Sequence, residues 1–155
     1  MEKKVILLIE DNPDDIKLTQ RAFVKSNIAD KIDLRIAVDG QSALDYLFGL
    51  NLKKGTSKEQ LPAIILLDLN LPKLNGLQVL ERIRNEKSTK LIPVIILTSS
   101  KEDADLACAY KLGTNSYIRK PVDFEKFKAA IQQLGLYWVD LNESPSSVTY
   151  PSYRT

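Results

Sequence analysis

The chain alternates short runs of apolar residues with longer segments in which apolar residues recur every three or four positions. The short runs have the length of buried β-strands and cover residues 5–9, 34–38, 63–67, 94–97 and 116–118. The longer segments predict amphipathic helices over residues 13–27, after Asp39-Gly40, around 77–92, up to Gly113 and over 124–138. Five strands alternating with five helices predict an α/β fold, a doubly wound parallel sheet covered on both faces.

Polar residues follow the ends of four of these runs. Glu10 and Asp11 follow the first run, Asp68 follows the third and Thr98 the fourth, while Lys120 comes shortly after the fifth. The carboxyl ends of parallel strands lie along one edge of a sheet, so we expect these side chains to meet. Three acids, a hydroxyl and an ammonium group suit a divalent cation and a phosphoryl group.

Length and composition exclude several other classes of site. The 155 residues, 44% of them hydrophobic, suit one domain with a substantial core. The chain contains no histidine, which excludes Ser-His-Asp and Cys-His catalysis and histidine-ligated zinc. Its single cysteine, Cys108, lies in a helical pattern between two alanines, and we expect a buried core thiol without a function.

The charge pattern predicts neither a nucleic acid nor a membrane as partner. The net charge is +2, from 22 basic and 20 acidic residues, and no run of lysine or arginine resembles a nucleic-acid footprint. The first apolar run ends after five residues without a small-residue cleavage site, and no other segment approaches membrane-spanning length. We therefore expect a cytoplasmic protein.

The polar residues at the strand ends resemble, in type and order, the receiver domain of two-component response regulators. The matching pieces are Glu10-Asp11, Asp68 within LLDLNLPKLNG, Thr98 within VIILTSS, Lys120-Pro121, and Pro72 and Gly76 at the family's distances beyond the aspartate. The resemblance covers residues 4–138 and implies a flavodoxin-like receiver over residues 1–141. Residues 142–155, rich in Ser, Pro, Thr and Tyr, predict an irregular tail with no appended output domain.

The resemblance assigns the phosphoryl and metal chemistry to four residues. Asp68 would be the phosphoacceptor, because an aspartate carboxylate can form an acyl phosphate. A Mg²⁺ ion would neutralise the repulsion between the two anions. Asp11 and Asp68 would bind it directly, Glu10 through a water molecule, and Asn70 through its backbone carbonyl.

Three further residues have expected roles in the response to phosphorylation. Lys120 and Thr98 would contact the phosphoryl oxygens, and neither would act as a base or a nucleophile. Tyr117 matches the aromatic position that moves inward when the threonine moves, although a half-buried strand tyrosine without a switching role fits the sequence equally well. The family pattern also predicts a cis bond between Lys120 and Pro121.

The expected function is that of a stand-alone phosphorelay protein, not a metabolic enzyme, served by a sensor histidine kinase. The loop over residues 50–61 and the Tyr137-Trp138 helix are similar to those of the single-domain regulators of bacterial phytochrome kinases. The loop could equally be a tolerated solvated connection, and Trp138 could simply pack against its own domain. We expect a homodimer surface on the fourth helix, fifth strand and fifth helix, extended by the apolar residues 136–141.

Three other functions share parts of this residue pattern. A receiver-like interaction module without phosphorylation is the main alternative, but such modules usually lose one of the site residues. An aspartate-nucleophile phosphohydrolase usually has a second aspartate two positions after the first, where this chain has Asn70. A flavin-binding protein of this fold would need a phosphate loop after the first strand, where the acidic Glu10-Asp11-Asn12 would repel the phosphate.

Overall fold

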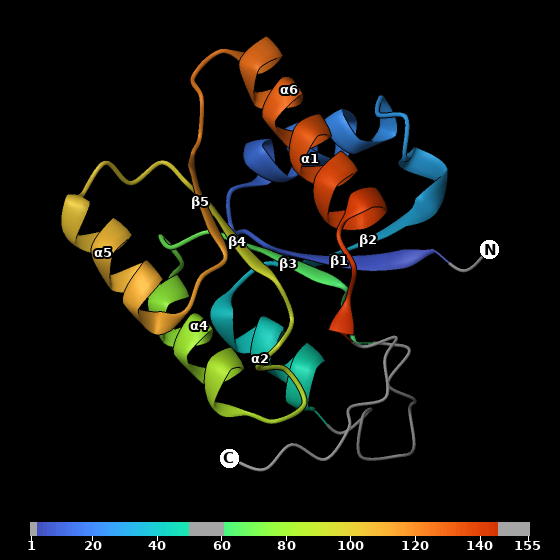
Figure 1. Ribbon diagram of the computed structural model, residues 1–155. Helices are drawn as coiled ribbons and strands as arrows, with labels where there is room; N and C mark the ends of the chain where they lie inside the picture. The colour runs from blue at the N-terminus through green and yellow to red at the C-terminus, as the bar shows by residue number, and fades with distance from the viewer. Residues whose placement is uncertain (1–2, 50–60, 146–155) are drawn as a thin grey trace.

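The computed structural model describes residues 3–49 and 61–145, in which five strands form one parallel sheet. The predicted loop over residues 50–61, except its last residue, and most of the predicted tail lie outside the described residues. The sheet order is β2-β1-β3-β4-β5, so the strand order reverses between β1 and β3 (Figure 1). The strands are β1 (Lys4–Ile9), β2 (Ile32–Ala37), β3 (Ile64–Leu67), β4 (Val94–Thr98) and β5 (Ser116–Arg119).

Helices cover both faces of the sheet, which confirms the predicted doubly wound fold. One face carries α1 (Pro13–Val24) and α6 (Phe124–Gly135), and the other carries α2 (Gly40–Phe48), α4 (Gly76–Asn85) and α5 (Asp103–Leu112) (Figure 1). A short 3₁₀ helix, η1 (Ala29–Lys31), precedes β2, and a π-helical segment, η3 (Leu136–Leu141), follows α6. No helix in the described part of the chain is long and apolar enough to cross a membrane.

The strands have the alternation that a sheet buried on two faces requires. In β1, Leu7 and Ile9 pack with the helices on one face, whereas Ile6 and Leu8 pack with those on the other. All four residues of β3 are buried. Each fully buried Leu or Ile side chain contributes about 1.5–3 kcal/mol relative to its exposed state, so the middle of the sheet anchors the fold.

Helix α1 begins at Pro13 and is capped by Asn12, the residue before it. The Asn12 side chain accepts hydrogen bonds from the backbone amides of Asp14 and Asp15, at 2.9 and 3.3 Å. The two aspartates lie in the first turn, where the helix dipole favours negative charge. This cap fixes the first turn of α1 directly beside the end of β1.

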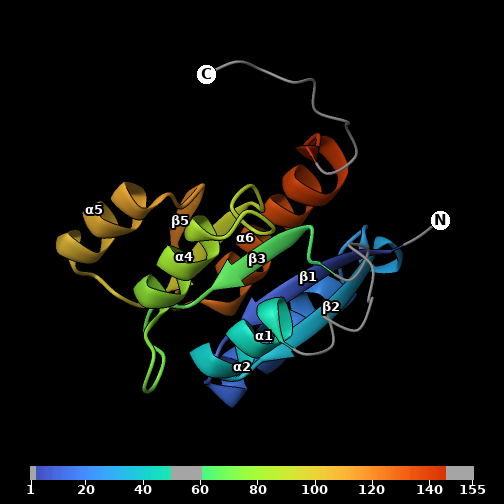
Figure 2. The ribbon, with the colours of Figure 1, turned by 90° about the horizontal axis from the view of Figure 1, so that it is seen from below.

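Arg84 ties the end of α4 to the end of α5. Its guanidinium group donates to the carbonyl oxygens of Gly113, Lys90 and Ile92 at 2.8–3.0 Å and to the Asn115 side chain at 2.8 Å. Helices α4 and α5 accordingly lie side by side in both views (Figure 1, Figure 2). Gly113 ends α5 in the left-handed conformation at φ 103°, as predicted for a helix terminus.

Two helix predictions and one burial prediction differ from the structure. The helix expected around residues 77–92 ends at Asn85, and Ile92 lies in the turns before β4. The last helix changes to a π-helical segment after Gly135, so Trp138 is not in regular α-helix. The prediction of a buried thiol is wrong, since Cys108 is only half-buried: α5 buries little beyond Ala109.

Candidate functional site

The register of the central strands brings the predicted acids together. Ile9 of β1 lies beside Leu67 of β3, and the backbone amide of Asp68 donates to the carbonyl of Ile9 at 3.0 Å. Glu10 and Asp68 therefore follow two adjacent strand ends at the point where the strand order reverses. Ligands of open α/β sheets bind at such a crevice.

Glu10, Asp11 and Asp68 form an acidic cluster in which one carboxylate oxygen of each lies within 4.8 Å of the others. Glu10 is 2% and Asp68 5% exposed, whereas Asp11 is open to solvent. Oxygen ligands with one exposed side suit a hard divalent cation that keeps some of its water molecules. The donor set thus fits a cation of the magnesium type. The backbone amide of Asn70 donates to Asp68 Oδ1 at 3.2 Å, which fixes the orientation of that carboxylate.

Lys120 contributes the positive charge of the site. Its ammonium group donates to Glu10, to Asp15 Oδ2 at 2.8 Å and to Asp68 Oδ2 at 3.2 Å. The side chain is only 7% exposed, although its backbone follows β5 at the sheet edge. The backbone amide of Lys120 donates to the Thr98 carbonyl at 2.8 Å, which anchors this residue to the end of β4.

Asp15 is the residue of this site that the sequence analysis missed. Its place in the first turn of α1 suggested only an interaction with the helix dipole. The available signal was that Asp15 lies four residues beyond Asp11, in the first turn of α1, where a side chain can face the strand ends.

The pKa values of Glu10 and Asp68 are shifted in opposite directions. Burial raises the pKa of Glu10 to about 7, and the hydrogen bond that it shares with Asp68 adds to this effect. Burial also acts to raise the pKa of Asp68, but the Glu10 hydrogen bond and the Lys120 charge outweigh it and lower the pKa overall. Burial acts to lower the pKa of Lys120, but hydrogen bonds to Asp15 and Glu10 outweigh it and raise the pKa. Of the two carboxyl groups, Glu10 is therefore the one that takes up a proton near neutral pH, while Asp68 stays ionised.

Thr98 connects the acidic cluster to helix α5. The Thr98 side chain is fully buried, and its hydroxyl oxygen accepts from the backbone amide of Ser100 at 3.2 Å. The Ser100 hydroxyl in turn donates to Asp105 Oδ2 in α5 at 2.6 Å. The Tyr117 hydroxyl is buried nearby on β5 and has no hydrogen-bond partner among the described residues. Burial also raises the pKa of Tyr117.

Comparison with known proteins agrees with this geometry. The response regulator receiver domain family matches residues 6–132 of the chain. The chain belongs to this family. It is 42% identical to the probable methanogenesis regulatory protein FilR2 of Methanothrix harundinacea over 142 residues. These residues cover 91% of this chain and 87% of that protein.

Two solved structures of response regulators resemble the receiver closely. The phosphorylated cyanobacterial phytochrome response regulator RcpA is 33% identical with a TM-score of 0.83, over 92% of this chain and 99% of that chain. The Mn²⁺-bound form of Rcp1 is 34% identical with a TM-score of 0.81, over the same shares. Rcp1 of Synechocystis is also 33% identical over 144 residues, or 93% of this chain and 95% of that protein. The receiver is thus similar to response regulators, among them the phytochrome response regulator RcpA.

One expectation taken from the family is wrong for this receiver. The described residues contain no cis peptide bond, so the bond between Lys120 and Pro121 is trans. The Lys120 side chain nevertheless reaches Asp68 from this backbone.

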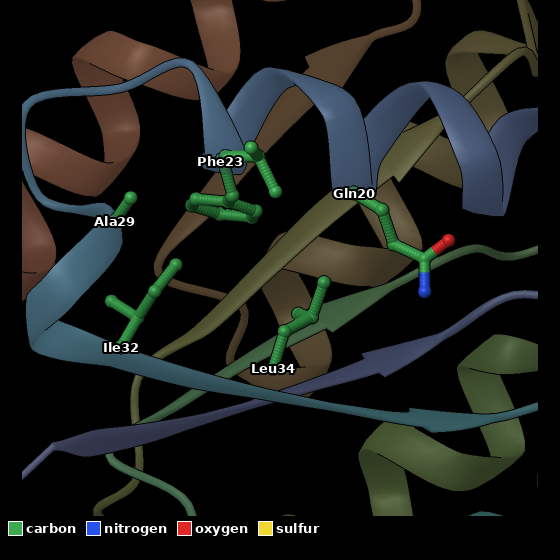
Figure 3. A pocket seen from close by; sticks show the side chains of 6 residues that line it. Gln20, Phe23, Ala29, Ile32 and Leu34 are labelled. Atoms are coloured by element: carbon green, nitrogen blue, oxygen red, sulfur yellow. The ribbon is translucent and has the colours of Figure 1, made fainter.

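A pocket on the same face as α1 lies away from the acidic cluster. It opens between the end of α1, η1 and β2, and its lining is almost entirely apolar (Figure 3). The lining residues are Gln20, Phe23, Val24, Ala29, Ile32 and Leu34. No ionisable side chain is among them, so this pocket offers no charged group to a ligand.

Proposed function

We propose that the receiver accepts a phosphoryl group on Asp68 from a sensor histidine kinase and signals through a change of its surface. The observation that carries this proposal is the position of the Asp68 carboxylate. It is nearly buried, beside two further acids and within hydrogen-bond distance of a lysine. A nucleophilic carboxylate with adjacent positive charge suits phosphoryl transfer.

In the proposed reaction, a carboxylate oxygen of Asp68 attacks phosphorus and the bond from phosphorus to the imidazole nitrogen of the kinase breaks. The nitrogen leaves with its electron pair and takes up a proton, and Asp68 becomes an acyl phosphate. The lowered pKa of Asp68 supports this role, since the attacking group is then the carboxylate. The same groups would promote hydrolysis of the acyl phosphate, and we do not assign a metabolic reaction to the protein.

A Mg²⁺ ion would be held by Asp11 and Asp68, by Glu10 through water and by the Asn70 carbonyl. When bound, it neutralises negative charge on the carboxylates and the phosphoryl group. The acidic cluster supports this assignment by its oxygen donors and its exposed side at Asp11. The structure of Rcp1 with bound Mn²⁺ supports a divalent cation in a similar receiver.

Lys120 would donate to a phosphoryl oxygen, and Thr98 would donate to another. Turning toward the phosphoryl group takes the Thr98 hydroxyl away from the Ser100 amide. We propose that Tyr117 responds to this movement, because its buried hydroxyl has no hydrogen-bond partner in the described part of the chain and gains by finding one. The Ser100 hydroxyl would carry the change to α5 through Asp105.

The proposed output surface consists of α5, β5, α6 and η3, and its proposed partner is a second copy of the receiver. Large apolar side chains are exposed here, with Tyr110 at 52%, Tyr137 at 51% and Leu141 at 64%. Such a group of exposed side chains favours a protein surface as its partner. A phytochrome-type kinase is the first phosphodonor to test, because the similar protein RcpA is a phytochrome response regulator.

The experiment is intact-mass measurement after incubation with acetyl phosphate, with and without Mg²⁺. The wild-type protein should gain one phosphate only with Mg²⁺, and Asp68→Asn should gain none. Asp45→Asn, which changes a carboxylate on α2 instead, is the matched control and should behave as wild type. Absence of any adduct on the wild-type protein would contradict the proposal and favour the interaction module that is never phosphorylated.

A further inference from the structure

Asp15 has no role in the proposed reaction so far, yet it makes a direct ion pair with Lys120. Lys120 has three N–H donors, and the structure gives each of them one carboxylate: Glu10, Asp15 and Asp68. Glu10 and Asp68 belong to the acidic cluster that would hold the cation. Among the described residues, Asp15 is therefore the one partner of Lys120 that lies outside the cation site.

A closed set of hydrogen bonds holds Asp15 in place. Glu10 Oε2 accepts from the backbone amide of Asn12 at 3.2 Å, and the Asn12 side chain accepts from the backbone amide of Asp15 at 3.3 Å. Asp15 Oδ2 then accepts from Lys120, which returns to Glu10. The ring ties the cap of α1 to the connection that follows β5. Thr19 adds a further bond, from its hydroxyl to the Asp15 carbonyl at 2.8 Å.

We propose that Asp15 is a positioning residue for phosphoryl transfer, which holds the Lys120 ammonium group where the phosphoryl oxygens arrive. This inference rests on the proposed function. A cation draws the oxygens of Glu10 and Asp68 to itself, and the phosphorylated Asp68 no longer offers a free carboxylate. Asp15 then keeps the flexible Lys120 side chain in the site. This reduces the conformational entropy that the side chain must lose in each phosphoryl transfer.

The neighbouring residue Asp14 provides the matched control. Asp14 and Asp15 have the same charge, lie in the same first turn of α1 and donate their backbone amides to the same Asn12 oxygen. Asp14 is exposed, whereas Asp15 is half-buried and contacts Lys120. Asp14→Asn and Asp15→Asn therefore change the charge of the helix end equally, and only the second variant weakens the ion pair.

The experiment measures the affinity for beryllofluoride, a small phosphoryl mimic, at saturating Mg²⁺. It also measures the rate of phosphorylation by acetyl phosphate and the Kd of Mg²⁺ alone. Asp15→Asn should lower the beryllofluoride affinity and the maximal phosphorylation rate about tenfold, or about 1.4 kcal/mol, because a charge-assisted hydrogen bond becomes a neutral one. Asp14→Asn should stay within about twofold of wild type in both. The Kd of Mg²⁺ should change less than the beryllofluoride affinity.

Two further variants separate positioning from a general loss of structure. Asp15→Glu keeps a carboxylate and should recover part of the loss. In a Lys120→Met background, Asp15→Asn should cause no further loss, since the proposed effect passes through Lys120. An Asp15→Asn protein that equals Asp14→Asn, reacts faster than wild type, or loses as much again without Lys120 would overturn the inference. A wild-type protein that takes neither phosphate nor beryllofluoride would instead overturn the proposed function.

Discussion

Binding of Mg²⁺ to the acidic cluster should release a proton below about pH 7. The perturbation is the pH itself, and the titrating group is Glu10, whose pKa burial raises to about 7. The pKa of Asp68 is lowered instead, so in the metal-free protein the proton is held by Glu10. A divalent cation favours two ionised carboxylates and must displace this proton.

The sign and size of the effect follow from this pKa. A raised carboxyl pKa means that the metal-free protein holds its proton up to about pH 7, so the affinity for Mg²⁺ must rise with pH through this range. Glu10 is neutral in about nine-tenths of molecules at pH 6 and in about one-tenth at pH 8. The apparent affinity should therefore be about tenfold higher at pH 8 than at pH 6.

Isothermal titration calorimetry at the two pH values, in buffers of different ionisation enthalpy, counts the released protons directly. About one proton should leave per Mg²⁺ at pH 6 and almost none at pH 8. Glu10→Gln removes the titrating group, so its weaker binding should not depend on pH. Asp11→Asn should weaken binding but keep the proton release. Equal affinity at both pH values, without a buffer-dependent heat, would refute the reasoning.

Three other substitutions test the packing around the site. Arg84→Met should lower the free energy of unfolding in urea by about 3 kcal/mol, because four hydrogen-bond acceptors lose their donor. The control Arg82→Met, at an exposed position, should lower it by under about 1 kcal/mol. Equal losses in the two variants would contradict the tie between α4 and α5. Tyr117→Phe should raise the free energy of unfolding by about 1 kcal/mol, since the buried hydroxyl has no hydrogen-bond partner within residues 3–49 and 61–145, and a loss of that size would argue against this. Gly76→Ala should lower the Tm and slow phosphorylation by acetyl phosphate, because its Cβ would lie 2.3 Å from the Asp68 carbonyl oxygen; wild-type values would show that the loop adapts.

The fold and most of the site follow from short-range patterns in the sequence. Continuous apolar runs such as residues 64–67 identify strands buried on both faces, and the polar residue after each run lies at the common sheet edge. The register that brings Glu10 beside Asp68 then needs only the pairing of Ile9 with Leu67. The position of these acids after adjacent strands was therefore enough to predict that they lie close together.

Contacts that depend on tertiary packing could not be predicted from the sequence in this way. The pairing of Asp15 with Lys120 joins residues 105 positions apart, on a helix and on a loop, and no periodic pattern encodes it. The apolar spacing of α5 predicted a buried stripe, but that helix fully buries Ala109 alone and leaves Tyr110 exposed. Periodicity predicts which residues share a helix face and does not predict how deeply that face is covered.

The most direct test of the central claim is to locate the phosphoryl group within the chain. After reaction with acetyl phosphate and Mg²⁺, borohydride reduces an acyl phosphate to an alcohol, which converts the phosphorylated aspartate to homoserine. Peptide mapping by mass spectrometry should then find homoserine at position 68 and at no other aspartate. Homoserine at Asp11 or Asp15, or an unmodified Asp68 in a protein that carries phosphate, would contradict the account.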